Sequence, residues 1–276
     1  MPHNSNSIQH NLAAWQKLVE HRHRLTRASR DEDFENPLAS VDAPGWLGGN
    51  IQGKRVLCLA SGGGRQGPLY AAAGAVVTVV DFCEALLDQD REVANARGLY
   101  LKTLQTCMTD LSALGNESFD VVIHPVSTCY VPNIQQVFRE VARVMRHDGI
   151  YISQHKQPAS LQAAIEPAVG AKGWTLEHQY YRREPLPMVL KDNLVREPGA
   201  EEYIHSWESI VGGMCRAGFV IEDLIEPLHA DNSAASPDSF AFRSGFVPPY
   251  VRIKARRKPT GESIDADNKT IWQPDL

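Results

Sequence analysis

Hydrophobic positions change their period repeatedly between residues 54 and 156. Short runs rich in β-branched residues predict strands near 55–60, 76–81, 100–106, 119–124 and 148–155. Apolar residues spaced three and four positions apart predict helices near 66–73, 84–97 and 133–146. Because strands that alternate with helices are typical of right-handed βαβ units, this pattern predicts five parallel strands.

The segments on either side of this core have other patterns. Apolar residues at helical spacing around Trp15 predict an amphipathic helix, and the prolines and glycines of 36–50 predict a loop into the first strand. Five prolines interrupt residues 158–200, which we interpret as an insertion. A helix near 205–217 and strands near 219–226 and 250–255 follow, and we expect these two strands to pair antiparallel at the sheet edge.

These patterns divide the chain into three parts. We expect an N-terminal helical cap over residues 1–50 and an α/β domain over residues 51–258, in which 158–200 is an insertion on the substrate side. Residues 259–276 are polar and are expected to form a C-terminal tail.

Composition and charge narrow the classes of protein that fit. The formal net charge of −5 argues against a general nucleic-acid binder, because neutralising phosphates needs a surplus of lysine and arginine. The five cysteines are widely spaced, with no C-x-x-C pair and no zinc-ligand spacing, so they indicate reduced thiols and no metal site. No apolar stretch approaches 18 residues, so we expect a cytoplasmic protein without a membrane span.

A glycine-rich turn after the first strand is the strongest chemical signal. Gly62, Gly64 and Gly67 fit G-x-G-x-x-G at a junction between a strand and a helix. Glycine allows a tight turn and the close approach of a ligand, and the start of the helix offers free N–H groups. Asp81 ends the second strand, 17 residues after Gly64. Its carboxylate is expected to accept the ribose hydroxyls of a nucleoside cofactor, or to cap the next helix.

Both dinucleotide dehydrogenases and methyltransferases use such a turn, and three later segments distinguish them. Met108-Thr-Asp-Leu111 follows the third strand. The segment 118–125 contains the fourth strand, which is followed by Pro125 after His124. The segment 144–152 leads into the fifth strand. In this order they resemble the class I S-adenosylmethionine-dependent methyltransferases, over residues 54–155 and more loosely over 205–255. The family pattern V-L-D-L-G-C-G-x-G corresponds to residues 56–64, and V-L-(R/K)-P-G-G corresponds to 144–149.

The resemblance implies a fold, a cofactor and a reaction. The fold is a Rossmann-like three-layer α/β sandwich with a mostly parallel seven-stranded sheet and an antiparallel edge strand. The cofactor is S-adenosyl-L-methionine, and the reaction is methyl transfer to a small-molecule acceptor, with no nucleic acid expected. A nucleoside-binding protein of the same fold without turnover, and an NAD-dependent oxidoreductase, are the alternatives. The acceptor, the atom that is methylated and the oligomeric state stay open.

The resemblance also implies residues for each part of the cofactor. Gly62 and Gly64 would face the methionine part, and Asp81 would bind the ribose. Phe82 would cover the adenine face, and Asp110 with Leu111 would meet the adenine edge. The remaining cofactor-binding candidates are Ala60, Ser61, Gln66 and His124. Two positions depart from the family pattern, because Cys58 stands where many members have an acid and Ala60 replaces a common glycine.

The loop after the fourth strand supplies the candidates for catalysis. Ligands in open α/β sheets bind beyond the carboxyl ends of the strands, so His124 and Tyr130 are expected near the methyl donor. Either one would act as a general base or orient the nucleophile, because methyl transfer needs an aligned lone pair. A hydrogen-bonded structural histidine and a tyrosine that only packs in the wall are the alternative interpretations.

Overall fold

The computed structural model describes the chain except for residues 1–2, 171–172, 194, 232–235, 237–238 and 259–276. The predicted C-terminal tail therefore lies outside the described residues. Within them, seven strands form one sheet in the order β3-β2-β1-β4-β5-β7-β6. Their bounds are β1 (Arg55–Leu59), β2 (Val76–Asp81), β3 (Leu101–Gln105), β4 (Phe119–His124), β5 (Met145–Lys156), β6 (Phe219–Ile225) and β7 (Tyr250–Arg257).

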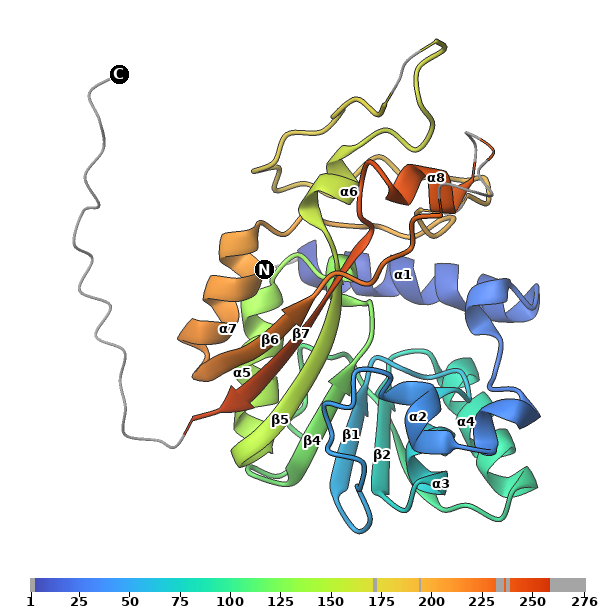
Figure 1. Cartoon of the computed structure of the whole chain (residues 1–276), viewed down its shortest axis with the longest axis vertical. Coiled ribbons are helices and arrows are strands. Elements are labelled where there is room, and N and C mark those ends of the chain that lie inside the picture. Colours follow the sequence, from blue (N-terminus) through green and yellow to red (C-terminus); the bar gives the residue numbers. More distant parts are fainter. Residues whose placement is uncertain (1–2, 171–172, 194, 232–235, 237–238, 259–276) are drawn as a thin grey trace, which may run out of the picture.

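The strand directions confirm the predicted topology. Strands β1 to β5 pair in parallel, and β7 runs antiparallel to both β5 and β6. Each predicted strand lies within a few residues of an observed one. The chain therefore has the Rossmann-like α/β fold, with the expected antiparallel pair at one edge (Figure 1).

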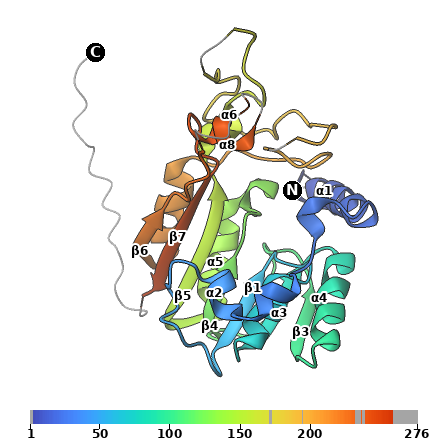
Figure 2. The same ribbon diagram turned by 45° about the vertical axis from the view of Figure 1, so that its right-hand side comes forward.

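Helices cover both faces of the sheet and its upper edge (Figures 1 and 2). The α-helices are α1 (His3–Glu20), α2 (Pro37–Val41), α3 (Gln66–Ala72), α4 (Glu84–Ala96), α5 (Ile134–Val144), α6 (Pro158–Gln162), α7 (Gly213–Arg216) and α8 (Phe240–Ser244). Short 3₁₀ turns η1 (Arg24–Thr26), η2 (Asp31–Phe34) and η3 (Thr128–Tyr130), and a π-helical turn η4 (Glu208–Gly212), lie between them.

One local prediction was wrong, and another was confirmed with a change of helix type. Residues 36–50 were expected to form a loop, but α2 begins within them, because the Asn36 side chain accepts the N–H of Ala39 and Pro37 takes the first helical position. The helix expected near 205–217 is present, because η4 and α7 follow each other without a break, but its first part is π-helical. Gly212 and Gly213 stand at this junction, and glycine is a weak helix former.

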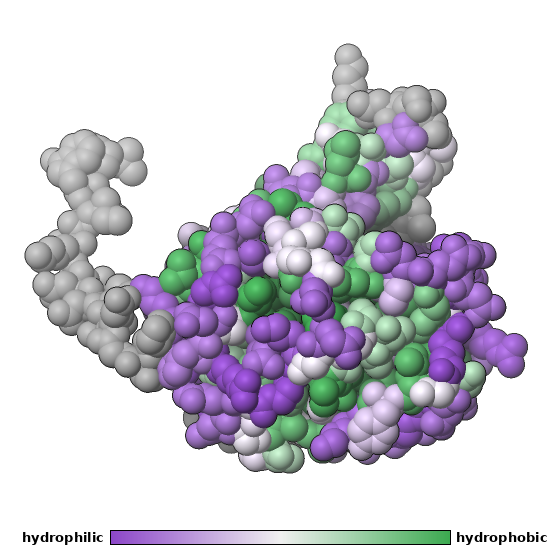
Figure 3. All heavy atoms as spheres, turned by 60° about the horizontal axis from the view of Figure 1, so that its bottom comes forward, coloured by the Kyte–Doolittle hydropathy of each residue, from purple (hydrophilic) through white to green (hydrophobic). Residues whose placement is uncertain are grey.

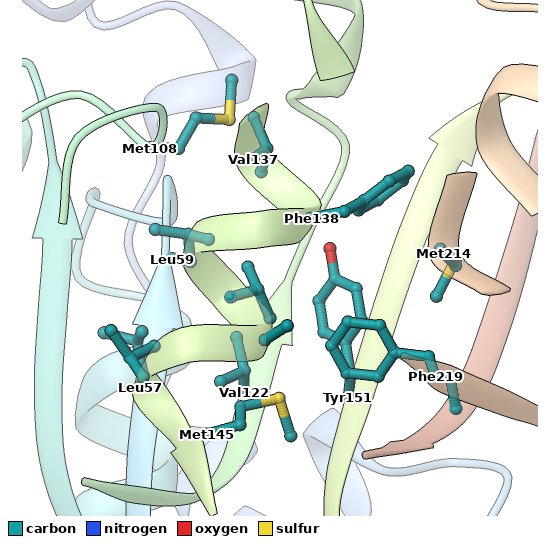
Figure 4. Packing of buried hydrophobic residues seen from close by; sticks show 14 of the residues in the cluster. Leu57, Leu59, Met108, Val122, Val137, Phe138, Met145, Tyr151, Met214 and Phe219 are labelled. Carbon is teal, nitrogen blue, oxygen red and sulfur yellow. The ribbon is translucent and has the colours of Figure 1, made fainter. Parts of the chain in front are cut away.

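The alternation of side chains along the strands divides the core into two layers. Leu57 and Leu59 of β1 pack with α5 and β5 on one face, whereas Val56 and Cys58 pack with α3 and α4 on the other. In the first layer the rings of Phe138, Tyr151 and Phe219 lie together (Figure 4). This two-sided burial fixes the sheet and therefore the position of the turns at its upper edge.

Helix α1 and the insertion cover the carboxyl ends of the parallel strands (Figure 1). The Asn11 side chain donates to the carbonyl of Tyr130 and accepts the N–H of Glu201 at 2.7 Å. The hydroxyls of Ser7 and Tyr203 are hydrogen-bonded at 2.7 Å. These bonds attach α1 to η3 and to the segment that directly follows the insertion.

The surface at the amino ends of the parallel strands lies on the other side of the molecule from the cavity. From this side hydrophilic residues are spread over the rim, with hydrophobic patches between them (Figure 3). In the described part of the chain, no helix is both long enough and apolar enough to cross a membrane.

Candidate active site

A cavity of about 480 Å³ lies at the carboxyl ends of the parallel strands, under α1. This volume is within the range of small-molecule sites. Its walls come from the turn after β1, the ends of β2 and β3, the loop after β4, α1 and the insertion. They include Ala60, Ser61, Gly62, Gly63, Gln66, Asp81, Phe82, Met108, Pro125, Trp15, Tyr130 and Glu197.

The glycine turn packs tightly against the residues behind it. Those neighbours leave no room for a side chain on the turn. A Cβ on Gly62 would lie 2.8 Å from the Cβ of Leu86, and Gly64 has a φ of +69°. Ala60, the residue that replaces a common glycine, has a φ of +48°. An alanine in this region is strained, so the first residue after β1 keeps a glycine-like backbone without glycine.

Asp81 lies at the end of β2, at the floor of the cavity. Its Oδ2 accepts the N–H of Gly62 at 2.9 Å and its Oδ1 accepts the N–H of Cys83 at 3.0 Å. Burial raises the pKa of this carboxyl to about 6, although these N–H groups oppose the shift. The carboxylate therefore couples the turn after β1 to the start of α4 and also faces the cavity.

Three predicted cofactor residues do not line the cavity. Gly64 is turned toward α4, where a Cβ would lie 2.9 Å from the Cγ2 of Val93. Leu111 is fully buried in the core, and its N–H donates to Glu140. Asp110 is exposed and accepts the N–H of Ser112. The loop after β3 instead brings Thr106, Cys107 and Met108 to the cavity.

His124 is also outside the main cavity, on the side of the sheet that α5 covers. Its Nδ1 is hydrogen-bonded to the Tyr151 hydroxyl and its Nε2 to the Ser127 hydroxyl, both at 2.7 Å. Burial lowers its pKa to about 3, so the ring is neutral. Both ring nitrogens are thus engaged in the protein interior, close to the loop that borders the cavity.

Tyr130 faces the cavity together with residues that the sequence analysis did not single out. Its ring packs edge-on against Trp15 of α1, with ring centroids 5.7 Å apart. Its phenol faces the carboxylate of Glu197 from the insertion, and this interaction helps to lower the pKa of Glu197. Burial and the charge of Glu197 raise the pKa of Tyr130, so its phenol stays protonated.

A buried ionic cluster holds Glu197 in place. The Nζ of Lys156, at the end of β5, lies 2.5 Å from Glu197 and 2.6 Å from Glu202, and Arg196 binds the second oxygen of Glu202. Burial opposes the charge of Glu197, but Lys156 lowers its pKa, so this carboxylate is ionised. Local sequence patterns do not reveal this cluster, because Glu197 and Glu202 are 41 and 46 residues away from Lys156, in a segment without a regular pattern.

Comparison with known proteins identifies relatives of this chain. Residues 57–153 match the family model described as a methyltransferase domain. The chain is 36% identical over 240 residues to an uncharacterized methyltransferase YbaJ of Bacillus subtilis, a match that covers 79% of this chain and 90% of the relative.

Solved structures agree with this at the level of the fold. An S-adenosylmethionine-dependent methyltransferase from Mesorhizobium loti matches with a TM-score of 0.63 and 21% identity, over 78% of this chain and 97% of that one. The 1,6-didemethyltoxoflavin-N1-methyltransferase of Burkholderia thailandensis, solved with S-adenosylhomocysteine, matches with a TM-score of 0.58 and 14% identity. That match covers 94% of this chain and 91% of the other.

Proposed function

Because this chain belongs to the class I S-adenosylmethionine-dependent methyltransferases, we propose that its cavity holds the methyl donor along the glycine turn and a small-molecule acceptor beside Tyr130 and Glu197. One observation carries the proposal. The Asp81 carboxylate and the Cβ-free turn at Gly62 line the same cavity as Tyr130, so donor and acceptor would meet there. An NAD-dependent oxidoreductase and a protein without turnover are not favoured by the relatives described above.

The cofactor end is proposed to consist of the turn, Asp81 and Phe82. The oxygens of Asp81 would accept the ribose hydroxyls, and the ring of Phe82 would cover the adenine. Ala60, Ser61 and Gln66 would lie along the methionine part. Gly64, Asp110, Leu111 and His124 would support this end from outside the cavity, because they do not line it.

Catalysis is proposed to depend mainly on orientation. The bound cofactor supplies an electrophilic methyl group on a sulfonium sulfur. The residues around the cavity would hold the acceptor with its lone pair directed at that methyl group, and this alignment in a site without water would lower the barrier. Trp15 and the insertion would exclude water from this end of the cavity.

Tyr130 is proposed to position the acceptor rather than to remove its proton. Its raised pKa keeps the phenol protonated, and Glu197 would accept the phenolic hydrogen. The phenolic oxygen is then free to accept a hydrogen bond from an acceptor O–H or N–H group. His124 would keep the Ser127 loop in place through its Nε2 bond.

Binding and turnover test these assignments separately. Calorimetry with S-adenosylmethionine, S-adenosylhomocysteine and NAD should show binding of the first two only, and formation of S-adenosylhomocysteine then reports turnover in an acceptor screen. Tyr130→Phe should lower turnover about tenfold and leave the Kd for S-adenosylhomocysteine within about twofold. Tyr181→Phe, an exposed tyrosine of the insertion, is the control. Unchanged turnover in Tyr130→Phe would remove the role of Tyr130 but not methyl transfer.

A further inference from the structure

One buried carboxylate beside the glycine turn has no part in the function proposed above. Asp90 lies on α4 and is fully buried, whereas Asp88 and Glu92 on the same helix are exposed. Its Oδ2 accepts the N–H of Gly63 at 2.9 Å. The same N–H also donates to the carbonyl of Leu86 at 3.0 Å. The helix after β2 thus sends an acid back to the turn after β1.

In the described part of the chain, no cation forms an ion pair with this acid. Its Oδ1 has no hydrogen-bond partner among the described residues. Arg91, the next residue, is directed to the surface, where it pairs with Glu84 and Asp88. Burial raises the pKa of Asp90 to about 7 and the charge of Asp81 adds to this, while the N–H groups on the turn and Arg91 oppose it. A buried acid with such an environment is costly and is typical of functional sites.

Asp90 lies near Cys58, the position at which the family pattern has an acid. Cys58 of β1 is fully buried and packs on the same face of the sheet as α4. Burial and the nearby charge of Asp90 both raise the pKa of the Cys58 thiol. A Cβ on Gly67 would lie 3.0 Å from the Oδ1 of Asp90, so the third glycine of the motif leaves room for this carboxylate.

We propose that Asp90 is a positioning residue of the cofactor site: it holds the glycine turn from α4 and replaces the acid that is absent from β1. This inference rests on the proposed function, because the turn must be the cofactor-binding segment for its position to matter. Together with Asp81, which holds Gly62, Asp90 fixes two successive N–H groups of the turn from two elements.

The first test measures the Kd for S-adenosylhomocysteine in the full-length protein at about pH 8.5, above the pKa of about 7, where Asp90 is ionised. Asp90→Asn keeps the shape of the side chain and one acceptor oxygen but removes the charge, and it should weaken binding about fivefold, since a charge-assisted hydrogen bond becomes a neutral one. Glu92→Gln, on the exposed side of the same helix, should leave the Kd unchanged. Thermal unfolding of each variant checks that it is folded.

The second test moves the acid to the position of the family pattern. Cys58→Asp alone should weaken binding, because it places a second carboxylate beside Asp90. Cys58→Asp combined with Asp90→Asn should restore the Kd to within about twofold of the wild type. Because neighbouring carboxylates also couple in stability, the free energy of unfolding of each variant is measured beside its Kd, and the inference requires that the Kd changes in variants that remain folded.

The outcomes separate this inference from the proposed function. If the wild type binds S-adenosylhomocysteine and Asp90→Asn binds equally well, or the double variant binds no better than Asp90→Asn, the role of Asp90 is overturned and the proposed function is not. If the wild type does not bind S-adenosylhomocysteine, both are overturned.

Discussion

The two ends of the cavity, which are proposed to hold the cofactor and the acceptor, are built in different ways. At the cofactor end, backbone N–H groups of the turn meet two buried carboxylates, and no basic side chain balances those carboxylates within ion-pair distance among the described residues. At the acceptor end, Glu197 is paired with Lys156 in a buried ionic cluster. The cofactor end therefore depends on backbone geometry, whereas the acceptor end depends on charge pairing between distant segments.

The largest expected effect concerns the acceptor end. Lys156→Met would leave Glu197 and Glu202 buried without their shared cation, and it should lower the free energy of unfolding by about 3–5 kcal/mol. Lys254→Met, which removes the more exposed pair with Glu222, should cost less than about 1 kcal/mol. Urea unfolding of both variants measures the difference. Equal losses in the two variants would show that the cluster does not hold the insertion in place.

The cofactor end should respond to pH instead. Since the pKa of Asp90 is raised to about 7, the folded state binds more protons than the unfolded state between the ordinary pKa of an aspartate and pH 7. Its contribution to stability is therefore lost as the pH rises. Between pH 5 and 7 the free energy of unfolding of the wild type should fall by about 2 kcal/mol more than that of Asp90→Asn. Unfolding of both proteins at each pH measures this difference. Parallel pH profiles for the wild type and the variant would contradict this.

Asp81→Asn tests the same end of the cavity through its affinity for S-adenosylhomocysteine. It removes the charge that the ribose hydroxyls are proposed to meet, so the Kd for S-adenosylhomocysteine should rise about tenfold in calorimetry. Asp88→Asn, an exposed acid of α4, is the control. An unchanged Kd for Asp81→Asn would mean that Asp81 serves the turn and not the cofactor.

The smallest effect concerns the strained backbone after β1. Ala60→Gly should raise the free energy of unfolding by about 0.5–1 kcal/mol, because glycine adopts the φ of +48° without strain but loses more chain entropy on folding. Ala71→Gly in α3 should have the opposite sign. Thermal unfolding of the pair decides, and a loss in both variants would contradict strain at Ala60.

The difference between the ends also explains what the sequence could predict. The strands, the turn and Asp81 follow from local patterns, and the strands were found within a few residues. The side of the sheet on which His124 lies was predictable too, because it is two residues after Val122, which faces α5. The pair of Lys156 and Glu197 was not predictable, because only the folded chain brings these residues together.

The Asp90 contact falls between these cases. Its partner is 27 residues away, in the preceding βα unit, and the pattern of α4 gives a buried aspartate no distinguishing mark. The cysteine at position 58 was the available sign, because a missing acid in a motif raises the question of which residue replaces it.

The anchored insertion has a consequence for how its outer surface can change. Its buried end is fixed by the cluster and by the bond from the N–H of Leu186 to the carbonyl of Glu202, while Leu176 and Tyr181 in the preceding stretch are exposed. Substitutions between 173 and 184 would therefore change the outer surface of the insertion without disturbing its attachment to β5. None of the residues from 173 to 184 lines the cavity, so the outer face of this loop is free to diverge in evolution while the cavity itself stays the same.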